Sequence, residues 1–264
     1  MRHRLLLKRR NDLKSEYIKS RSDLFVAKQS VSSKRYRTFY LRMHPRAKEL
    51  IAQTYADQRS QEWLNLRGNL LTASDAATAI GLNPYEKPEG LLAKKCGAAR
   101  PWAGNEATAH GTRLEPMVRD LYDMRHGQIS HEIGLVQHPV HKFLGGSPDG
   151  ITESGRLLEI KCPLSRKIKP EVPGYYLPQI QLLLEIMDLE VCDFLQYKQG
   201  PPEEFVVVEV PRDREWFAQY LPVMKDFWDR VLAMRVKGIC DVEIDEISVE
   251  AVPVEEPACE VELN

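Results

Sequence analysis

The stretch over residues 145–162, which reads GGSPDGITESGRLLEIKC, constrains the fold more than any other part of the chain. Asp149 follows a Gly-Gly-Ser-Pro turn, and residues 153–155 have the composition of a second turn. The residues between and after these turns predict a β-hairpin whose second strand covers residues 157–161. The chain is therefore predicted to fold around a hairpin whose local geometry brings polar side chains together.

This hairpin is predicted to gather two carboxylates and a lysine. Side chains alternate along a strand, so Glu159 and Lys161 share one face while the opposite face is apolar. Ionised groups in a partly buried position are costly unless they are paired or bind a cation. Because no histidine or cysteine has matching spacing, Asp149 and Glu159 favour Mg²⁺ or Mn²⁺ over zinc. Such an ion activates a bound water, which Lys161 can orient or help deprotonate; the alternative is a purely structural role.

Composition bounds the rest of the chain. At 264 residues with 43% hydrophobic content, one domain with extensions is expected. No run of about 18 apolar residues exists, so no membrane span is expected. The five cysteines form no Cys-x-x-Cys pair, which favours an intracellular, reducing compartment such as the cytoplasm or nucleus of a host cell, and argues against a zinc or iron–sulfur module.

The two ends of the chain carry opposite charge. Residues 1–50 hold 15 Lys and Arg against 4 Asp and Glu, whereas residues 239–264 hold 9 acidic residues and no basic one. We therefore divide the chain into a basic extension (1–55), a central domain (56–238) and an acidic tail (239–264). The basic extension is predicted to follow a phosphate backbone, and the alternative for both ends is a solubilising extension.

An anion site is predicted around residues 61–77. A short helix over 61–67 is followed by a second helix that Thr72 or Ser74 would cap. Exposed N–H groups and a hydroxyl at a helix start bind anions, and Arg67 can supply the bidentate partner that a phosphate prefers. The alternative is ordinary capping, with Arg67 as a surface ion-pair partner.

Further elements place polar residues near the hairpin. An amphipathic helix around residues 114–122 carries Glu115 beside its apolar stripe. A buried helix over 175–187 carries Gln179 and Gln181, whose amides need partners. The loop after the hairpin carries basic residues that track a nucleic-acid strand or are simply solvated, namely Arg166, Lys167 and Lys169. Strands over 191–198 and 205–210 and a long amphipathic helix over 212–236 complete the predicted domain.

Five short motifs follow one another within residues 58–200. They are Trp63…Arg67…Thr72-Ala73-Ser74, His110-Gly111…Glu115-Pro116, Ser147-Pro148-Asp149-Gly150, Glu159-Ile160-Lys161 and Gln179-Ile180-Gln181. In this order they resemble the YqaJ-type viral recombinase family, which includes the phage lambda exonuclease and belongs to the PD-(D/E)xK nucleases. The basic extension and the acidic tail have no counterpart in the compact phage enzymes.

The resemblance implies a restriction-endonuclease-like α/β core with a central mixed sheet flanked by helices. It also implies Mg²⁺-dependent, processive 5′→3′ digestion of one strand at the ends of double-stranded DNA. The product would be a 3′ overhang for a single-strand annealing protein, and family members assemble as a ring-shaped homotrimer around DNA.

Carried over by motif, the resemblance assigns roles to the hairpin and its surroundings. Asp149 and Glu159 would bind metal together with the carbonyl of Ile160, and Glu115 would hold a second metal ion or its water shell. Lys161 would act on the attacking water.

The remaining roles concern the predicted helix over 175–187 and the predicted anion site around residues 61–77. One glutamine of the pair Gln179 and Gln181 would support the lysine, and Arg67 and Ser74, next to Thr72, would bind the 5′ phosphate.

Two rival functions remain open at this point. One is an endonuclease on the same scaffold, which would cut covalently closed circles, and the other is a non-catalytic DNA-binding module that uses the basic extension and the loop over residues 166–169.

Overall fold

The larger of two mixed β-sheets forms the centre of the protein. The structure is a computed structural model that describes residues 43–56, 58, 60–97 and 106–237. The larger sheet has the order β2-β5-β6-β7-β8, in which β6 and β7 are parallel and the other neighbours antiparallel. Its strands are β2 (Ser130–His131), β5 (Gly150–Thr152), β6 (Arg156–Lys161), β7 (Val191–Lys198) and β8 (Glu204–Pro211). The predicted α/β fold with a central mixed sheet flanked by helices is confirmed.

The predicted hairpin is formed by β5 and β6. Ile151 pairs with Leu157 in antiparallel register, and Asp149 directly precedes β5. Gly155 closes the turn with φ +86°, and a Cβ there would lie 2.4 Å from the Cγ atom of His44. Glycine is therefore required at this position both for its backbone conformation and for the close approach of the His44 ring.

A smaller sheet leads into the hairpin. It has the order β1-β4-β3 and consists of β1 (Leu71–Thr72), β3 (Val136–Gln137) and β4 (Leu144–Gly146). A Cβ at Gly146 would lie 2.6 Å from the Leu183 side chain, so the glycine lets a helix pack directly on β4. Only three residues separate β4 from β5, and the last of them is Asp149.

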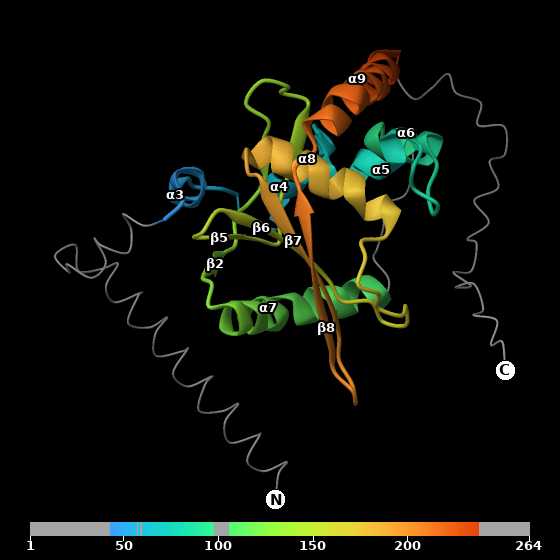
Figure 1. Cartoon of the computed structure of the whole chain (residues 1–264). Helices are drawn as coiled ribbons and strands as arrows, with labels where there is room; N and C mark the ends of the chain where they lie inside the picture. Colours follow the sequence, from blue (N-terminus) through green and yellow to red (C-terminus); the bar gives the residue numbers. More distant parts are fainter. Residues whose placement is uncertain (1–42, 57, 59, 98–105, 238–264) are drawn as a thin grey trace, which may run out of the picture.

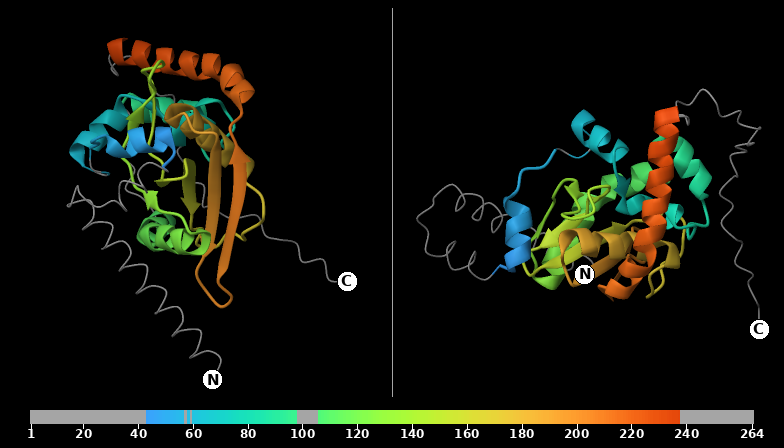
Figure 2. Two further views of the ribbon diagram at one scale, coloured as in Figure 1. Left: turned by 60° about the vertical axis from the view of Figure 1, so that its left-hand side comes forward. Right: turned by 90° about the horizontal axis from the view of Figure 1, so that it is seen from above.

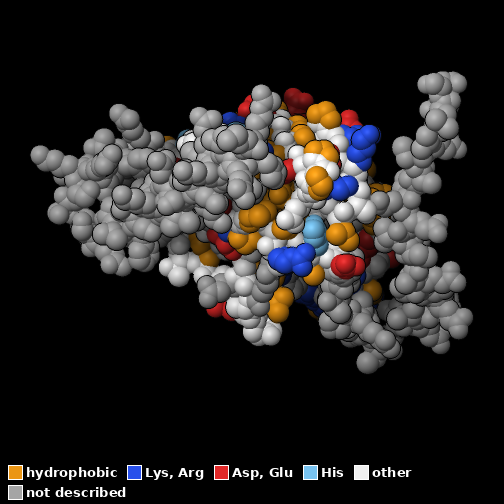
Figure 3. All heavy atoms as spheres, turned by 90° about the horizontal axis from the view of Figure 1, so that it is seen from below, with side chains coloured by type: hydrophobic (Ala, Val, Ile, Leu, Met, Phe, Trp, Pro, Cys, Tyr) orange, Lys and Arg blue, Asp and Glu red, His pale blue; other side chains and the backbone are white. Residues whose placement is uncertain are grey.

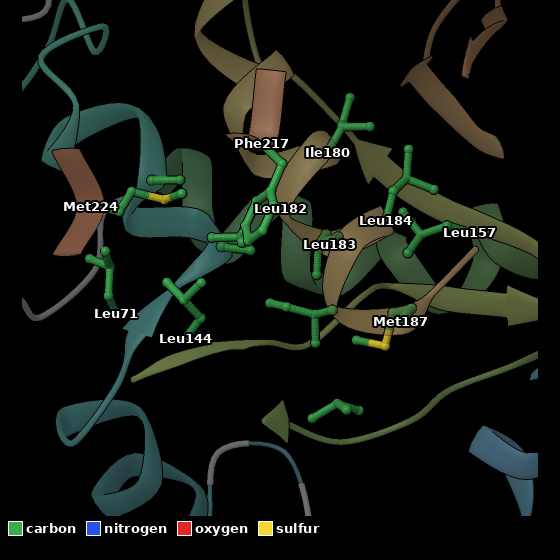
Figure 4. Packing of buried hydrophobic residues seen from close by; sticks show 14 of the residues in the cluster. Leu71, Leu144, Leu157, Ile180, Leu182, Leu183, Leu184, Met187, Phe217 and Met224 are labelled. Atoms are coloured by element: carbon green, nitrogen blue, oxygen red, sulfur yellow. The ribbon is translucent and has the colours of Figure 1, made fainter. Parts of the chain in front are cut away.

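Helices cover both faces of the larger sheet (Figure 1). On one face lies α7 (Glu106–His126), whose Leu114, Val118 and Tyr122 are buried against the sheet, as the apolar stripe predicts. On the other face lies α8 (Leu177–Met187), a nearly fully buried helix that forms the crossover between the parallel strands β6 and β7. Its leucines occupy the centre of the main hydrophobic core (Figure 4). On the α7 side, hydrophobic, basic and acidic side chains of the described residues are interspersed at the surface (Figure 3).

Five further helices complete the described fold. They are α3 (Pro45–Ala52), α4 (Gln61–Gly68), α5 (Ala76–Ala79), α6 (Pro88–Lys95) and α9 (Arg214–Lys237), with two short 3₁₀ turns, η1 (Ala73–Asp75) and η2 (Gly174–Tyr176). The long α9 runs across the top of the molecule above α8 (Figure 2). Its Phe227 and Val231 are buried in the main core, which fits the predicted amphipathic helix.

The helix α3 lies within the segment assigned to the basic extension. Pro45 is its first residue, and Ala47 and Leu50 are fully buried in the main core. The folded core thus begins before residue 56, although the three-part division of the chain stays a prediction. The predictions for residues 1–42 and for the acidic tail lie outside the described residues.

Two predictions from composition concern the cysteines and membrane spans. Cys96, Cys162 and Cys192, the cysteines within the described ranges, are buried free thiols. Within the same ranges, no helix combines the length and the hydrophobicity that a bilayer span needs.

Candidate active site

Two carboxylates of the hairpin meet at the open end of β5 and β6. The backbone N–H of Ile160 donates to Oδ2 of Asp149 over 2.6 Å, so the hairpin itself fixes the aspartate. Glu159 points to the α8 side of the sheet and is only 1% exposed. The structure therefore brings Asp149, Glu159 and Lys161 together, as predicted from the alternation of side chains along the strand.

The two carboxylate oxygens of Glu159 differ in their hydrogen bonding. Lys161 Nζ and Gln179 Nε2 both donate to Oε1, over 2.5 and 2.6 Å. The second oxygen, Oε2, is buried and has no hydrogen-bond partner among the described residues. A buried carboxylate oxygen that lacks a donor is costly, so this site is incomplete without a further positive group.

Electrostatics support the same conclusion. Burial raises the pKa of Glu159 to about 8, and the negative charge of Asp149 adds to the rise. Burial also raises the pKa of Asp149, although the charge of Lys161 opposes this. For Lys161, burial alone lowers the pKa, but the charges of Glu159 and Asp149 outweigh it, so the pKa lies above its usual value. One lysine thus balances two buried carboxylates only in part.

The residues present fit a divalent cation. The hard carboxylate oxygens of Asp149 and Glu159 and the free lone pairs of Glu159 Oε2 are the donor chemistry that Mg²⁺ and Mn²⁺ prefer. Glu115, half-buried on α7, contributes its charge to the raised pKa of Glu159 and therefore faces the same region. The described residues hold no cluster of three His, Cys, Asp or Glu side chains in metal-binding geometry. Backbone carbonyls, water or substrate oxygens would complete the ligand set.

Arg119 is a site residue that the sequence analysis missed. It lies on α7 one turn after Glu115, and its Nη1 donates to the backbone carbonyl of Asp149 over 2.7 Å. Its Nη2 forms a 2.7 Å ion pair with Glu132, and its stem lies next to Gly150. Arg119 therefore anchors the loop that carries Asp149 to the helix that carries Glu115. The only sequence signal was an arginine on the buried stripe of an amphipathic helix, where an unpaired cation is rare.

A second polar cluster surrounds Arg67. Its Nη2 donates to Ser74 Oγ over 3.0 Å and lies 3.5 Å from Thr72 Oγ1. Its guanidinium also stacks on the ring of Trp63, 4.6 Å from the ring centroid. Burial lowers the pKa of Arg67, and the charge of Asp75 opposes that decrease. No carboxylate of the described residues forms an ion pair with Arg67, and its guanidinium directly contacts neutral hydroxyls and an indole ring, an arrangement that suits an anion.

The structure confirms Thr72 as the cap of a short helical segment. Thr72 is the N-cap of η1, which continues directly into the four-residue helix α5, and its hydroxyl donates to Asp75 over 2.6 Å. Asp75 in turn forms a 2.7 Å ion pair with Lys95, and these interactions hold its pKa below the usual value despite burial. The predicted anion site therefore rests on the guanidinium and hydroxyl of Arg67 and Ser74. It does not rest on the start of a long helix.

Trp63 connects the two clusters. Its indole Nε1 donates to Ser147 Oγ over 3.2 Å, and Ser147 lies two residues before Asp149. The same indole ring supports Arg67. The candidate anion site and the candidate metal site are therefore adjacent in the fold, although they are far apart in the sequence.

Other predicted site residues have different surroundings. Gln179 contacts Glu159, not the lysine itself, while Gln181 bonds the backbone of Pro211 and Asp213 and so ties α8 to the start of α9. Gln179 thus contacts the candidate metal site, whereas the Gln181 amide is engaged elsewhere in the fold; a site role for either glutamine stays a prediction.

The three basic residues of the loop after the hairpin also differ in their surroundings. Arg166 is half-buried and donates to Gln196 on β7 over 2.9 Å, which pins the loop to the sheet. Lys167 and Lys169 are exposed, and Lys169 lies 3.6 Å from Glu171. A DNA contact by this loop stays a prediction for the two lysines, whereas Arg166 is already engaged within the fold.

The chain is similar in sequence to a known protein family and to several viral proteins. A family model described as the YqaJ-like viral recombinase domain matches residues 62–190. The uncharacterized protein R354 of Acanthamoeba polyphaga mimivirus is 34% identical over 195 residues, which are 67% of this chain and 36% of that protein. Protein D345L of African swine fever virus is 31% identical over 156 residues, 47% of this chain and 44% of that protein. The chain thus spans less than half the length of these two viral relatives.

Solved structures share the fold. An alkaline exonuclease from Laribacter hongkongensis has 26% sequence identity and a TM-score of 0.59 over 66% of this chain and 93% of that chain. The same enzyme in complex with dAMP matches with a TM-score of 0.58 and 25% identity over the same shares of the two chains. The matched family domain, residues 62–190, includes the hairpin and the Arg67 cluster.

Proposed function

Residues 62–190 of this chain belong to the YqaJ-like viral recombinase domain family, and from this premise we propose that the protein is a metal-dependent DNA exonuclease. We propose that it hydrolyses phosphodiester bonds from the 5′ end of one strand of linear duplex DNA. The similarity to an alkaline exonuclease supports this reaction class. The observation that carries the proposal is the buried pair Asp149 and Glu159 beside Lys161, in which one glutamate oxygen has no hydrogen-bond partner among the described residues.

The candidate metal ligands are Asp149, Glu159, the carbonyl of Ile160 and, for a second ion, Glu115. Bound Mg²⁺ or Mn²⁺ would supply Lewis-acid stabilisation of phosphate charge and a lower pKa for a bound water. Gln179 holds Glu159 in place through Oε1, which leaves Oε2 free to act as a ligand. Lys161 is held beside the same glutamate, where its amine would orient the attacking water towards phosphorus.

The Arg67 cluster supplies a physical origin for strand polarity. A terminal 5′ phosphate carries more negative charge than an internal phosphodiester, and Arg67 with Ser74 offers charge and hydrogen-bond donors for it. Because Trp63 links this cluster to the Asp149 loop, a bound 5′ end would lie near the scissile bond. Recognition of a chain end in place of a base sequence is what a 5′→3′ exonuclease requires.

Three broader predictions accompany this proposal. They are a single-strand annealing protein as partner, a homotrimer, and an intracellular, reducing environment. None of them is needed for the chemistry at the hairpin.

The test compares linear and closed DNA. Linear 5′-phosphorylated duplex and covalently closed circular DNA are each incubated with the protein in Mg²⁺, in Mn²⁺ and in EDTA, and released nucleotides are quantified. We expect release from the linear duplex alone, and only with metal. Cutting of closed circles would favour an endonuclease, and salt-sensitive binding without metal-dependent cleavage would favour a DNA-binding module.

A further inference from the structure

Three tyrosines connect the candidate active site to the protein surface. The Lys161 ammonium lies 5.0 Å from the ring centroid of Tyr176, at the start of α8. The rings of Tyr176 and Tyr175 have centroids 4.4 Å apart. Tyr175 in turn meets Tyr85, which lies on the loop between α5 and α6, edge to face with centroids 5.4 Å apart. Aromatic surface therefore extends without interruption from the lysine to this loop.

The outermost ring is exposed although it is held in place. Tyr85 is 69% exposed, whereas Tyr175 and Tyr176 are half-buried. Its backbone N–H donates to Asn83 Oδ1 over 3.0 Å, and Asn83 Nδ2 donates to Thr78 Oγ1 over 2.7 Å. The loop that presents Tyr85 is thus anchored to α5. An anchored ring loses little conformational entropy when a ligand stacks on it.

The charges around this ring are compatible with a nucleic acid. Glu86, the neighbouring acidic residue, is engaged in an ion pair with Lys94. Burial raises the pKa of Tyr175 and the positive charge of Arg166 opposes the rise, which shows that a guanidinium lies near the same ring pair. A phosphate chain that approaches Tyr85 would therefore meet paired acidic groups and a nearby cation.

We propose that Tyr85, braced by Tyr175, is a stacking site for a nucleobase of the DNA end that is being digested. Stacking on an aromatic ring tolerates every base, because each base has a π-face. This tolerance is the property that an enzyme of low sequence preference needs beside its hydrolytic site. The inference rests on the proposed DNA substrate but assigns a base-binding role to residues outside the hairpin and the Arg67 cluster.

The experiment measures binding without cleavage. Duplexes with 2-aminopurine at the terminal positions are titrated with protein in Ca²⁺ in place of Mg²⁺, and both affinity and the fluorescence of the modified base are recorded. Tyr85→Ala is expected to weaken binding about tenfold and to abolish the fluorescence change, in line with the loss of one stacked base. Tyr85→Phe and Tyr85→Trp should behave like the original protein, because they keep the ring.

A matched control lies on the same loop. Leu82 is 48% exposed, and Leu82→Ala should leave both affinity and fluorescence unchanged. Melting temperatures establish that each variant is folded, and Tyr85→Phe separates stacking from a hydroxyl contact if Tyr85→Ala is unstable. Unchanged binding by Tyr85→Ala would overturn the stacking site, as would a Tyr85→Phe variant that binds as weakly as Tyr85→Ala.

Failure of the wider proposal has a different signature. If the original protein neither binds nor digests DNA, the proposed function falls and the stacking site falls with it. If the original protein binds and digests DNA while Tyr85→Ala is indistinguishable from it, only the stacking site is refuted.

Discussion

The hairpin site and the Arg67 cluster are two neighbouring polar centres with opposite electrostatics. In the hairpin, Asp149 and Glu159 share one lysine, and one buried oxygen of Glu159 has no donor within the part of the chain that the structure describes. Around Arg67, a half-buried guanidinium is surrounded by hydroxyls and an indole ring, without an ion-paired carboxylate in the described chain. The first centre is therefore suited to a cation and the second to an anion. We propose that a metal ion binds at the first and a phosphate group at the second.

The two centres also differ in how the chain builds them. Asp149, Glu159 and Lys161 lie within 13 residues of one another, and the pairing of β5 with β6 places them. The Arg67 cluster depends on distant segments. Lys95 on α6 donates to the backbone carbonyl of Arg67 over 3.1 Å, and Arg235 on α9 donates to that of Gly68 over 2.6 Å. Substitutions in the hairpin should therefore abolish hydrolysis, whereas substitutions in the Arg67 cluster should change the preference for one kind of DNA end.

The largest effect is expected from Lys161→Ala or Asp149→Asn. Each removes a group that would act directly at the scissile bond, so nucleotide release should fall by about a thousandfold or more. Lys225→Ala, at an exposed position on α9, is the control and should keep full activity. Release by either hairpin variant at a near-normal rate, from protein with an unchanged melting temperature, would contradict the catalytic role of the hairpin.

A smaller but more selective effect is expected from Arg67→Ala. Digestion of 5′-phosphorylated ends should fall roughly ten- to a hundredfold, because a charge-assisted contact to phosphate is lost, while 5′-hydroxyl ends should change little. Arg67→Lys keeps the charge but loses the bidentate fork, and it should lie between the two. The measurement is the ratio of initial rates on the two substrates. An equal loss on both would remove the distinction between the two centres.

Arg119→Met tests whether metal affinity depends on the anchoring of Asp149. Loss of the bond to the Asp149 carbonyl should raise the Mg²⁺ concentration for half-maximal activity about tenfold, as expected for a residue that positions a ligand. It should also reduce the increase in melting temperature on adding Mg²⁺, a readout that needs no catalysis. Glu132→Gln removes the ion pair but keeps the bond to Asp149, so it should behave like the original protein. A Mg²⁺ response equal in both variants would contradict the positioning role.

The same contrast explains what the sequence could predict. The hairpin, the buried helix α8 and the stripe of α7 follow from turn residues and periodicity, which are local properties. The alternation of side chains was sufficient to place Glu159 beside Lys161. Arg119, Lys95 and Arg235 were missed because their roles arise only when α6, α7 and α9 pack against other segments.

Two further positions show where local patterns in the sequence stop being informative. The choice between Gln179 and Gln181 depends on the rotation of α8 against the sheet, which periodicity in so apolar a helix does not determine. Thr72 is the opposite case, because a capping signal is local and it correctly predicted the start of the short segment η1–α5, although not the choice between Thr72 and Ser74.

The smallest predicted effect concerns Arg235 on α9, which contacts the end of α4 next to Arg67. It donates to the carbonyls of Gly68 and Lys95, and Arg235→Ala removes these bonds without touching any group that would contact DNA. We expect the preference for 5′-phosphorylated over 5′-hydroxyl ends to fall two- to fivefold, with a loss of about 1 kcal/mol in the free energy of unfolding. Arg230→Ala, at an exposed position on the same helix, is the control. If Arg235→Ala lowers digestion of both ends equally while Arg230→Ala is silent, α9 supports the hairpin as well, and the two centres are not energetically separate.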